Sequence, residues 1–197
     1  MKDSYKYIAG IDEVGRGTIA GPVVAAAVIL RRDISYDELD DSKRLTEKNR
    51  KLLSKKIISQ SIAWSISLSD VNEIDNLNIL WATMLAMRRS ILGLPCKPDF
   101  IQIDGNTLPN LEFYNEVLSA EAVIDGDAKI PAISAASIIA KVYRDNLMRS
   151  LGKIYPNFNF SKHKGYGTKD HIERLKEFGP CPQHRLSFRP LSGLFVK

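Results

Sequence analysis

The amino-acid sequence predicts an α/β fold in which helices flank a mixed β-sheet. Two apolar segments near the N-terminus have the composition of consecutive strands, and strands then alternate with amphipathic helices. Strands first and alternation afterwards favour a mixed sheet over a fully doubly wound one. Three of the expected strands also end in acidic residues beside glycine, which suggests that these acids gather in one site.

The first strands are expected at residues 5–12 and 22–30, joined by a glycine-rich turn. An antiparallel pair is the simplest arrangement for two strands connected in this way. Residues 62–68 alternate large apolar side chains with alanine and serine, the period-2 pattern of a third, half-buried strand. Apolar runs predict further strands near 99–104 and 121–125.

Helices are expected at about 46–60, with Thr46 as the N-cap, and at about 134–150, with Ser134 as the N-cap. A longer helix is predicted near 71–92. It begins with an aspartate and a glutamate at capping-box spacing, and its large apolar residues repeat at helical intervals. We expect this apolar stripe to face the core; it consists of Ile74, Leu77, Leu80, Trp81, Met84 and Leu85.

The 197 residues contain no linker or low-complexity segment, which predicts one domain over 1–197 with a helical C-terminal extension at about 150–197. The chain has 28 basic and 23 acidic residues, a net charge of +5, which favours polyanionic partners. Neither the two cysteines nor the three histidines have ligand spacing, and we expect the histidines at the periphery. Without a signal peptide or a long apolar segment, a cytoplasmic protein with no membrane contact is predicted.

The segment 11–21 carries two adjacent acids into a turn rich in glycine. Desolvating the Asp12 and Glu13 carboxylates is unfavourable unless a cation or strong donors compensate. Glycine can expose N–H groups to a ligand, and Arg16 is a planar donor suited to phosphate. The segment therefore predicts a metal site beside a phosphate-binding surface, or, taken alone, an exposed turn with solvated acids.

Acids in matching contexts favour the metal site. Asp104 follows the apolar run 100–103, and Asp125 and Asp127 follow the apolar run 122–124. Neighbouring carboxylates repel by about 4 kcal/mol at about 4 Å and an effective dielectric of about 20, so a group of them calls for a cation. Oxygen ligands suit Mg²⁺ or Mn²⁺. Metal-assisted phosphoryl transfer uses all of these acids, whereas a glycosidase needs only two.

Six motifs follow one another along the chain: D-E-V-G-R-G at 12–17, I-D-x-x-N-I-L at 74–80, I-D-G-N at 103–106, G-D-A-K at 126–129, S-A-A-S-I-I-A-K-V-Y-R-D at 134–145 and K-G-Y-G-T at 164–168. In order and spacing they resemble the ribonuclease HII family. The resemblance implies a ribonuclease H-like fold and a nuclease that hydrolyses the RNA strand of RNA–DNA hybrids. It also implies incision 5′ of single ribonucleotides in duplex DNA, leaving 3′-hydroxyl and 5′-phosphate ends.

The resemblance assigns the four catalytic, metal-binding carboxylates to Asp12, Glu13, Asp104 and Asp127, with two Mg²⁺ or Mn²⁺ ions when substrate is bound. Asp125 precedes the glycine rather than following it, and we expect it either to have a structural role or to support a ligand without binding the metal itself. Because neighbouring residues of a strand face opposite ways, the first two acids can share a site only if their strand ends or bends there.

The same resemblance implies the substrate contacts. The backbone of Gly15, Arg16 and Gly17 matches the turn that reads the ribonucleotide's 2′-hydroxyl, the group that distinguishes RNA from DNA. Tyr166 matches the tyrosine that stacks on the deoxyribose at the junction. Lys43 matches a phosphate contact.

Two residues on the predicted helix at 134–150 have open roles. Lys141 is either a charge near the metal site or a surface lysine. Asp145 is either a further ligand or the partner of Arg144 or Arg149 in a salt bridge, and we leave it outside the set of four ligands.

Two other functions remain open at this point. A ribonuclease HIII-like hybrid nuclease resembles the chain less, because its turn lacks the arginine and it has an extra N-terminal domain. A catalytically silent nucleic-acid-binding module would need the basic surface but not the acids. A monomer is expected.

Overall fold

The computed structural model describes residues 5–36, 39, 45–113 and 116–194. Its elements, in chain order, are β1 (Ile8–Val14), β2 (Val23–Ile29), α1 (Glu47–Gln60), β3 (Ala63–Ser69), α2 (Val71–Leu92), β4 (Phe100–Asp104), β5 (Glu112–Phe113), β6 (Glu116–Val117), β7 (Ala120–Val123), α3 (Gly126–Lys129), α4 (Pro131–Ile154), the 3₁₀ turn η4 (Pro156–Phe158), α5 (Phe160–His163), α6 (Lys169–Phe178) and α7 (Leu191–Leu194). Lys43 lies outside the described residues.

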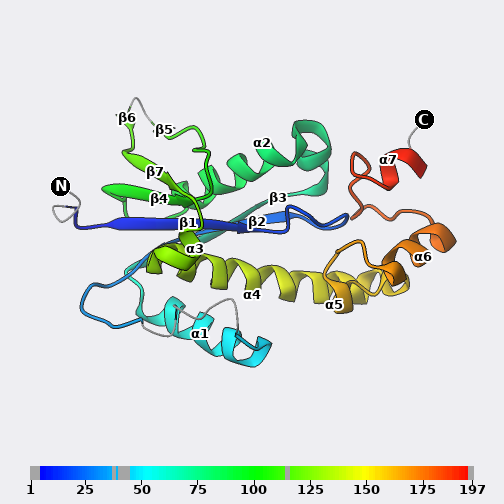
Figure 1. Ribbon diagram of the computed structural model, residues 1–197, viewed down its shortest axis with the longest axis horizontal. Helices are drawn as coiled ribbons and strands as arrows, with labels where there is room; N and C mark the ends of the chain where they lie inside the picture. The colour runs from blue at the N-terminus through cyan, green and yellow to red at the C-terminus, as the bar shows by residue number, and fades with distance from the viewer. Residues whose placement is uncertain (1–4, 37–38, 40–44, 114–115, 195–197) are drawn as a thin grey trace.

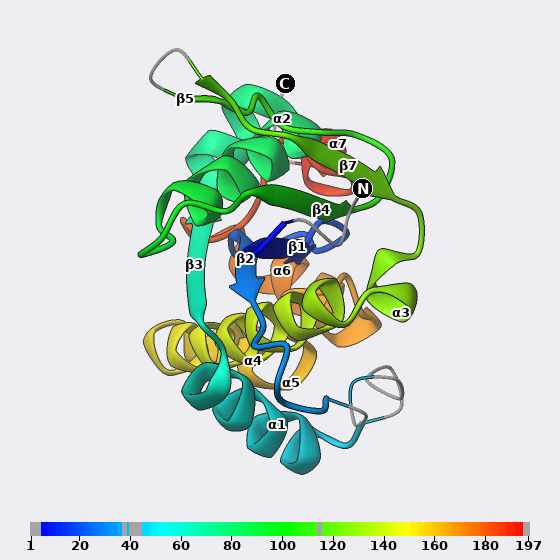
Figure 2. The ribbon, with the colours of Figure 1, turned by 90° about the vertical axis from the view of Figure 1, so that its left-hand side faces the viewer.

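A five-stranded mixed sheet has the order β3-β2-β1-β4-β7. The pairs β1–β2 and β2–β3 are antiparallel, and β1–β4 and β4–β7 are parallel. The predicted mixed sheet and its antiparallel first pair are therefore confirmed. Helix α2 covers one face of the sheet and α4 the other, with α1 on the outer side of α4 (Figures 1 and 2).

Strand β2 is buried on both faces, which explains its continuous apolar sequence. Val23 and Ala25 belong to the core that contains residues of α2, whereas Val24 and Ala26 belong to the core that contains residues of α4. Because successive side chains of a strand point to opposite faces, β2 contributes side chains to the cores on both sides of the sheet.

Helix α4 begins at Pro131, three residues before the predicted start, and Ser134 is not its N-cap. Proline is favoured in the first turn of a helix, where its missing N–H has no partner to lose. Ser134 instead lies buried inside the helix, and its hydroxyl donates to the Leu39 carbonyl at 3.1 Å. The start of α4 packs so closely on β1 that a Cβ at Gly10 would lie 2.1 Å from the carbonyl carbon of Ala132.

The apolar stripe predicted for α2 is wrong in its middle. Asn78 has φ 66° and ψ 167°, which interrupts the helix, and its side chain accepts hydrogen bonds from the backbone N–H groups of Leu80 and Trp81. Asn78 therefore caps a second helical segment, and the face of the helix changes there. Trp81 is 58% exposed, while Met84 is buried as expected.

Two helix starts are confirmed. Thr46 accepts a hydrogen bond from the Asn49 N–H at 3.3 Å. Asp70 and Glu73 form the predicted capping box, with each side chain accepting from the other residue's N–H at 2.9–3.0 Å. Within the described residues, no helix is long and apolar enough to cross a membrane.

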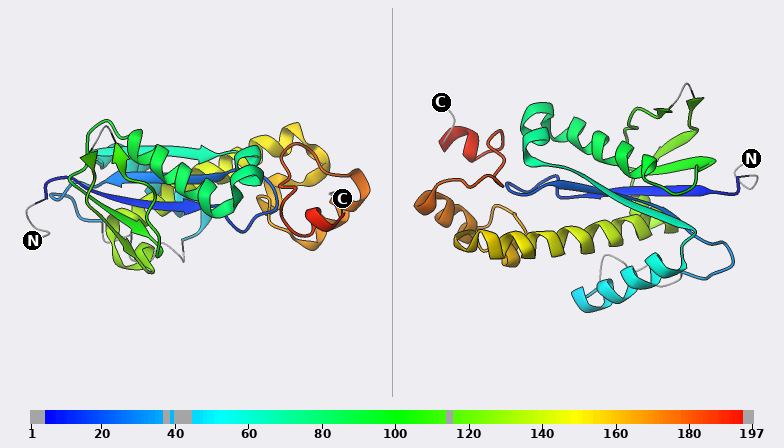
Figure 3. Two further views of the ribbon diagram at one scale, coloured as in Figure 1. Left: turned by 90° about the horizontal axis from the view of Figure 1, so that it is seen from above. Right: turned by 180° about the vertical axis from the view of Figure 1, so that it is seen from behind.

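The C-terminal helices gather at the end of the sheet opposite the N-terminus, beyond the turn that joins β1 and β2 (Figure 3). The histidines there are not peripheral as expected, because His171 and His184 are buried. The Cys181 N–H donates to Nδ1 of His184, Nε2 of His184 lies 3.0 Å from Nε2 of His171, and Nδ1 of His171 lies 2.8 Å from the Tyr166 carbonyl oxygen. These contacts fit two neutral rings in which His184 donates to His171 and His171 donates to Tyr166.

Burial lowers the pKa of both His171 and His184 to about 4. Their pKa values in the unfolded chain are higher, about 6.5, so the unfolded state takes up protons first as the pH falls. We therefore expect their contribution to stability to be complete above about pH 6.5 and to be lost towards pH 4. The slope is up to about 1.4 kcal/mol per pH unit for each histidine.

Urea denaturation between pH 7.5 and 4.5 in EDTA measures this slope. Other groups also titrate in this range, so the informative comparison is between the wild type and His171→Asn. The variant should lose less stability per pH unit, and identical slopes would show that the imidazole chain does not control acid sensitivity.

Candidate active site

The parallel strands β1, β4 and β7 bring the three acidic strand ends to one edge of the sheet. Ile11 pairs with Ile103, so Asp12 and Asp104 occupy neighbouring positions on β1 and β4. Asp104 in turn pairs with Val123 of β7, just before the turn that leads to Asp127. Parallel strands end on the same side, and this shared edge is why acids distant in sequence meet.

Asp12 is only 5% exposed and lies on the face of β1 that α4 covers. Its carboxylate accepts from the Glu13 N–H at 2.7 Å and interacts with the Ser137 hydroxyl of α4. Burial, and then the nearby charges of Glu13 and Asp104, raise the pKa of Asp12 well above its ordinary value. Asp12 forms no ion pair with the described residues.

Glu13 is held between the neighbouring acids and Arg16. One guanidinium nitrogen of Arg16 lies 3.3 Å from Oε1 of Glu13, and the Glu13 and Asp12 carboxyl groups also share a hydrogen bond. Burial raises the pKa of Glu13, and Arg16 opposes this shift. Strand β1 continues to Val14 rather than ending between the two acids, yet both interact with Asp104.

Asp104 fastens α3 to the end of β4. Its Oδ1 accepts from the N–H groups of Gly126 at 2.7 Å and Asp127 at 3.3 Å. A side chain at Gly126 would collide with Ile133 of α4, since its Cβ would lie 2.6 Å from Cδ1. Gly126 thus lies where strand, turn and helix converge, and a larger residue would require the Ile133 side chain to move.

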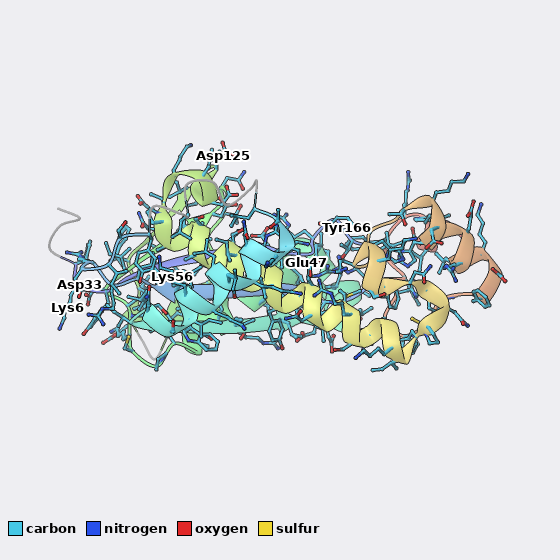
Figure 4. The ribbon with its side chains drawn as sticks, turned by 90° about the horizontal axis from the view of Figure 1, so that it is seen from below. Lys6, Asp33, Glu47, Lys56, Asp125 and Tyr166 are labelled. Atoms are coloured by element: carbon cyan, nitrogen blue, oxygen red, sulfur yellow. The ribbon has the colours of Figure 1, made fainter. Side chains whose placement is uncertain are left out.

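Asp127 and Asp125 lie on opposite sides of this glycine and differ in exposure. Asp127 is partly buried, whereas Asp125 is exposed, has φ 54° and caps no helix with its side chain. Figure 4 shows Asp125 at the outer edge of the molecule beside α3. Within the described residues, no three His, Cys, Asp or Glu side chains form a ready-made metal site. The four carboxylates are thus neighbours without being assembled as ligands.

The glycine-rich turn at 15–22 and the loop at 164–168 lie against each other. The Ile19 N–H donates to the Gly165 carbonyl at 2.9 Å. Arg16 is exposed at the tip of the turn, and the Tyr166 side chain is 45% exposed on the adjoining loop (Figure 4). The structure therefore brings the two expected recognition segments together.

On α4, Lys141 forms an ion pair with Asp145 at 2.8 Å. The structure therefore gives Asp145 a salt bridge, but with Lys141 rather than with Arg144 or Arg149, the two partners considered from the sequence. Arg149 pairs with Glu47 of α1, and Arg144 is fully buried among backbone carbonyl groups. Sequence reasoning missed the buried role of Arg144, whose only sequence signal is an arginine directly after an apolar helical stretch.

Comparison with known proteins agrees with this geometry. Residues 9–190 match the family model described as Ribonuclease HII. The ribonuclease HII of Idiomarina loihiensis is 50% identical over 189 residues, covering 96% of this chain and 98% of that protein. Among solved structures, the ribonuclease H2 of Pyrococcus horikoshii OT3 superimposes with a TM-score of 0.77 at 27% identity, covering 95% of this chain and 96% of that one.

A second structure, the ribonuclease HII of Archaeoglobus fulgidus solved as a complex with PCNA, gives a TM-score of 0.75 at 26% identity and covers 93% of this chain and 95% of that one. The matched region includes every described residue of the candidate site. The chain belongs to the ribonuclease HII family, whose members are endoribonucleases.

Proposed function

We propose that this endoribonuclease incises a DNA-containing duplex 5′ of a ribonucleotide, leaving 3′-hydroxyl and 5′-phosphate ends, and hydrolyses the RNA strand of RNA–DNA hybrids at the same site. One observation carries the proposal. The buried Asp12 and the partly buried Glu13 lead directly into a turn whose tip, Arg16 and Gly17, is exposed. The same turn contacts the loop of Tyr166 through the hydrogen bond from Ile19 to Gly165. Cleavage and recognition of the ribose thus belong to one continuous surface.

Ribonuclease HII is a family of metal-dependent nucleases, and the acids of this chain fit a divalent cation. All four candidate ligands are carboxylates, which suit Mg²⁺ and Mn²⁺. Burial and repulsion from neighbouring carboxylates raise the pKa values of Asp12 and Glu13. Among the described residues, Arg16 is the cation that forms an ion pair with this group, so a bound metal ion would relieve the remaining negative charge. We propose that two Mg²⁺ or Mn²⁺ ions are held by Asp12, Glu13, Asp104 and Asp127. When bound, such ions make water a better nucleophile and stabilise the leaving oxygen.

The protein itself supplies orientation. The Ser137 hydroxyl fixes Asp12, and the N–H groups at the start of α3 fix Asp104, so both carboxylates are positioned before a substrate arrives. The backbone of Gly15, Arg16 and Gly17 is proposed to contact the 2′-hydroxyl, and Tyr166 to stack on the neighbouring sugar.

Two lysines are proposed to contact phosphates. They are Lys43, by its match to the family motif, and Lys141, which lies one helical turn after Ser137 on α4. The net charge of +5 supports electrostatic attraction of a nucleic acid.

We further propose that the protein acts as a monomer with a single catalytic domain and functions in the cytoplasm. Cys96 and Cys181 are free thiols, which supports a reducing compartment.

The experiment that tests the proposal uses a labelled DNA duplex with one ribonucleotide, an all-DNA duplex and a continuous RNA–DNA hybrid, each with Mg²⁺, Mn²⁺ or EDTA. We expect metal-dependent incision 5′ of the ribonucleotide and none in the all-DNA duplex. Cleavage restricted to the continuous hybrid would instead support a ribonuclease HIII-like specificity. Binding without cleavage under every metal would refute the catalytic assignment.

Replacing Asp12 with Asn should separate stability from catalysis. We expect the incision rate to fall by about 100-fold or more, the scale of losing one group that stabilises the transition state electrostatically. In EDTA the melting temperature should rise by about 2–4 °C, because a buried charge with repulsive neighbours is removed. Added Mg²⁺ should raise the melting temperature of the wild type but scarcely that of the variant.

Asp125→Asn is the matched control, since Asp125 is exposed beside the same turn. It should retain both the incision rate and the Mg²⁺-dependent stabilisation. Equal Mg²⁺ responses in wild type and Asp12→Asn would remove Asp12 from the set of ligands.

Replacing Gly17 with Ala tests recognition by the turn. A Cβ at Gly17 would meet no atom within 4 Å, so the melting temperature should stay unchanged, while incision at a single ribonucleotide should fall by about 10-fold or more as the side chain intrudes on the sugar. Gly193→Ala, also in open space, is the control. Undiminished incision by Gly17→Ala would argue against backbone reading of the ribose at this position.

A further inference from the structure

Two arginines, Arg144 of α4 and Arg185 of the C-terminal region, are completely buried. Neither forms an ion pair with the described residues, and burial lowers the pKa of Arg144 to about 10 and that of Arg185 to about 9. Burying a guanidinium without a carboxylate is unfavourable unless its N–H groups are well satisfied. The acceptors of the two guanidinium groups therefore indicate why these arginines are buried.

Arg144 joins the two recognition segments. Its guanidinium donates to three acceptors in or beside the turn at 15–22 and to one in the loop at 164–168. The acceptors are the Pro22 carbonyl at 2.9 Å, the Thr18 hydroxyl at 2.8 Å, the Ala20 carbonyl at 3.1 Å and the Lys164 carbonyl at 2.8 Å. A planar group with five donors can bridge such a set, which a lysine ammonium cannot.

Arg185 holds the other side of the same turn. Its guanidinium donates to the carbonyl groups of Gly15, Arg16 and Gly21 at 2.7–2.9 Å. Most carbonyl oxygens of the turn, those of Gly15, Arg16, Ala20, Gly21 and Pro22, thus accept from the two guanidinium groups. The tip at Arg16 and Gly17 is left facing solvent, where a substrate can approach its N–H groups.

Glycine in each of the two segments allows this close packing of the turn, the loop and Arg144. A Cβ at Gly15 would lie 2.2 Å from Nε of Arg144, and one at Gly165 would lie 2.3 Å from the Ala20 carbonyl oxygen. Both residues also have positive φ angles, 98° and 89°. Gly17, by contrast, has open space where its Cβ would be, so its small size serves no contact within the protein.

We propose that Arg144 is a positioning residue for ribonucleotide recognition, because it clamps the turn at 15–22 to the loop at 164–168. The clamp fixes the distance between the turn backbone that contacts the 2′-hydroxyl and the Tyr166 ring that stacks on the neighbouring sugar. The proposal rests on the proposed function, in which these two segments contact the substrate. A duplex with a single ribonucleotide has a 2′-hydroxyl at one nucleotide only, so its recognition depends on that distance. Continuous RNA has a 2′-hydroxyl at every nucleotide, so its cleavage tolerates a larger displacement of the turn from the loop.

Arg144→Lys tests the proposal, because it keeps the charge but cannot bridge both segments. We measure kcat/KM with Mg²⁺ on a duplex containing one ribonucleotide and on a continuous hybrid of the same sequence. The ratio of single-ribonucleotide to hybrid activity should fall by about 10-fold or more, since displacements of about 1 Å reduce rates by about 100-fold. The Mg²⁺-induced rise in melting temperature should match the wild type, because the acids are untouched.

Arg149→Lys is the control, as this arginine lies on the same helix but pairs with Glu47 on the surface. It should leave the ratio unchanged. Thr18→Val provides a second variant of similar shape, which removes the hydroxyl that accepts from Arg144 and donates to the Gly15 carbonyl. It should lower the ratio in the same direction even if Arg144→Lys does not fold.

The outcomes distinguish a failure of the proposed function from a failure of the proposed role of Arg144. Wild type that fails to incise at a single ribonucleotide refutes the proposed function. Wild type that incises there, while folded variants at Arg144 and Thr18 keep the wild-type ratio or lose both activities equally, refutes only the clamp.

Discussion

The structure depends on the close approach of helix α4 to strand β1. At Gly10 the helix backbone occupies the space that any side chain would need. From this contact one face of α4 runs along the site: Ser137 reaches Asp12, and two turns later Arg144 reaches the glycine-rich turn. One helix therefore contacts both Asp12 and the recognition segments, while Asp104 is held by α3 and the other side of the turn by Arg185.

The same packing accounts for the chemistry. Covering β1 with α4 removes Asp12 from water, and the parallel partner β4 adds Asp104 beside it. The fold thus keeps a charge distribution that is unfavourable on its own. Within the part of the chain that the structure describes, Arg16 pairs with Glu13 and no cation pairs with Asp12. Unfavourable charge repulsion of this kind is typical of sites in which function opposes stability. A bound cation would remove the repulsion, and this relief would strengthen the binding of the metal.

The sequence was sufficient to predict the mixed sheet and the meeting of acidic strand ends, because strand periodicity and glycine are local signals. The sequence was insufficient for residues whose surroundings depend on backbone geometry or on segments far away in the chain. The exposure of Trp81 follows from the backbone angle of Asn78, which no hydropathy pattern contains. The buried roles of Arg144 and His171 depend on backbone carbonyl groups from other segments, and charged or titratable residues are ordinarily expected at the surface. The predicted start of α4 at Ser134 was wrong because proline three residues earlier already favours the first turn.

The most direct measurement is the activity and stability of Gly10→Ala, compared with Gly193→Ala. An added methyl at Gly10 must push α4 away from β1, and overpacking against backbone should lower the free energy of unfolding by about 1–3 kcal/mol. At a temperature where the variant is still folded by circular dichroism, incision per folded molecule and the Mg²⁺-induced stabilisation should fall together. Wild-type incision and stabilisation in a folded Gly10→Ala protein would contradict the claim that this contact positions the site.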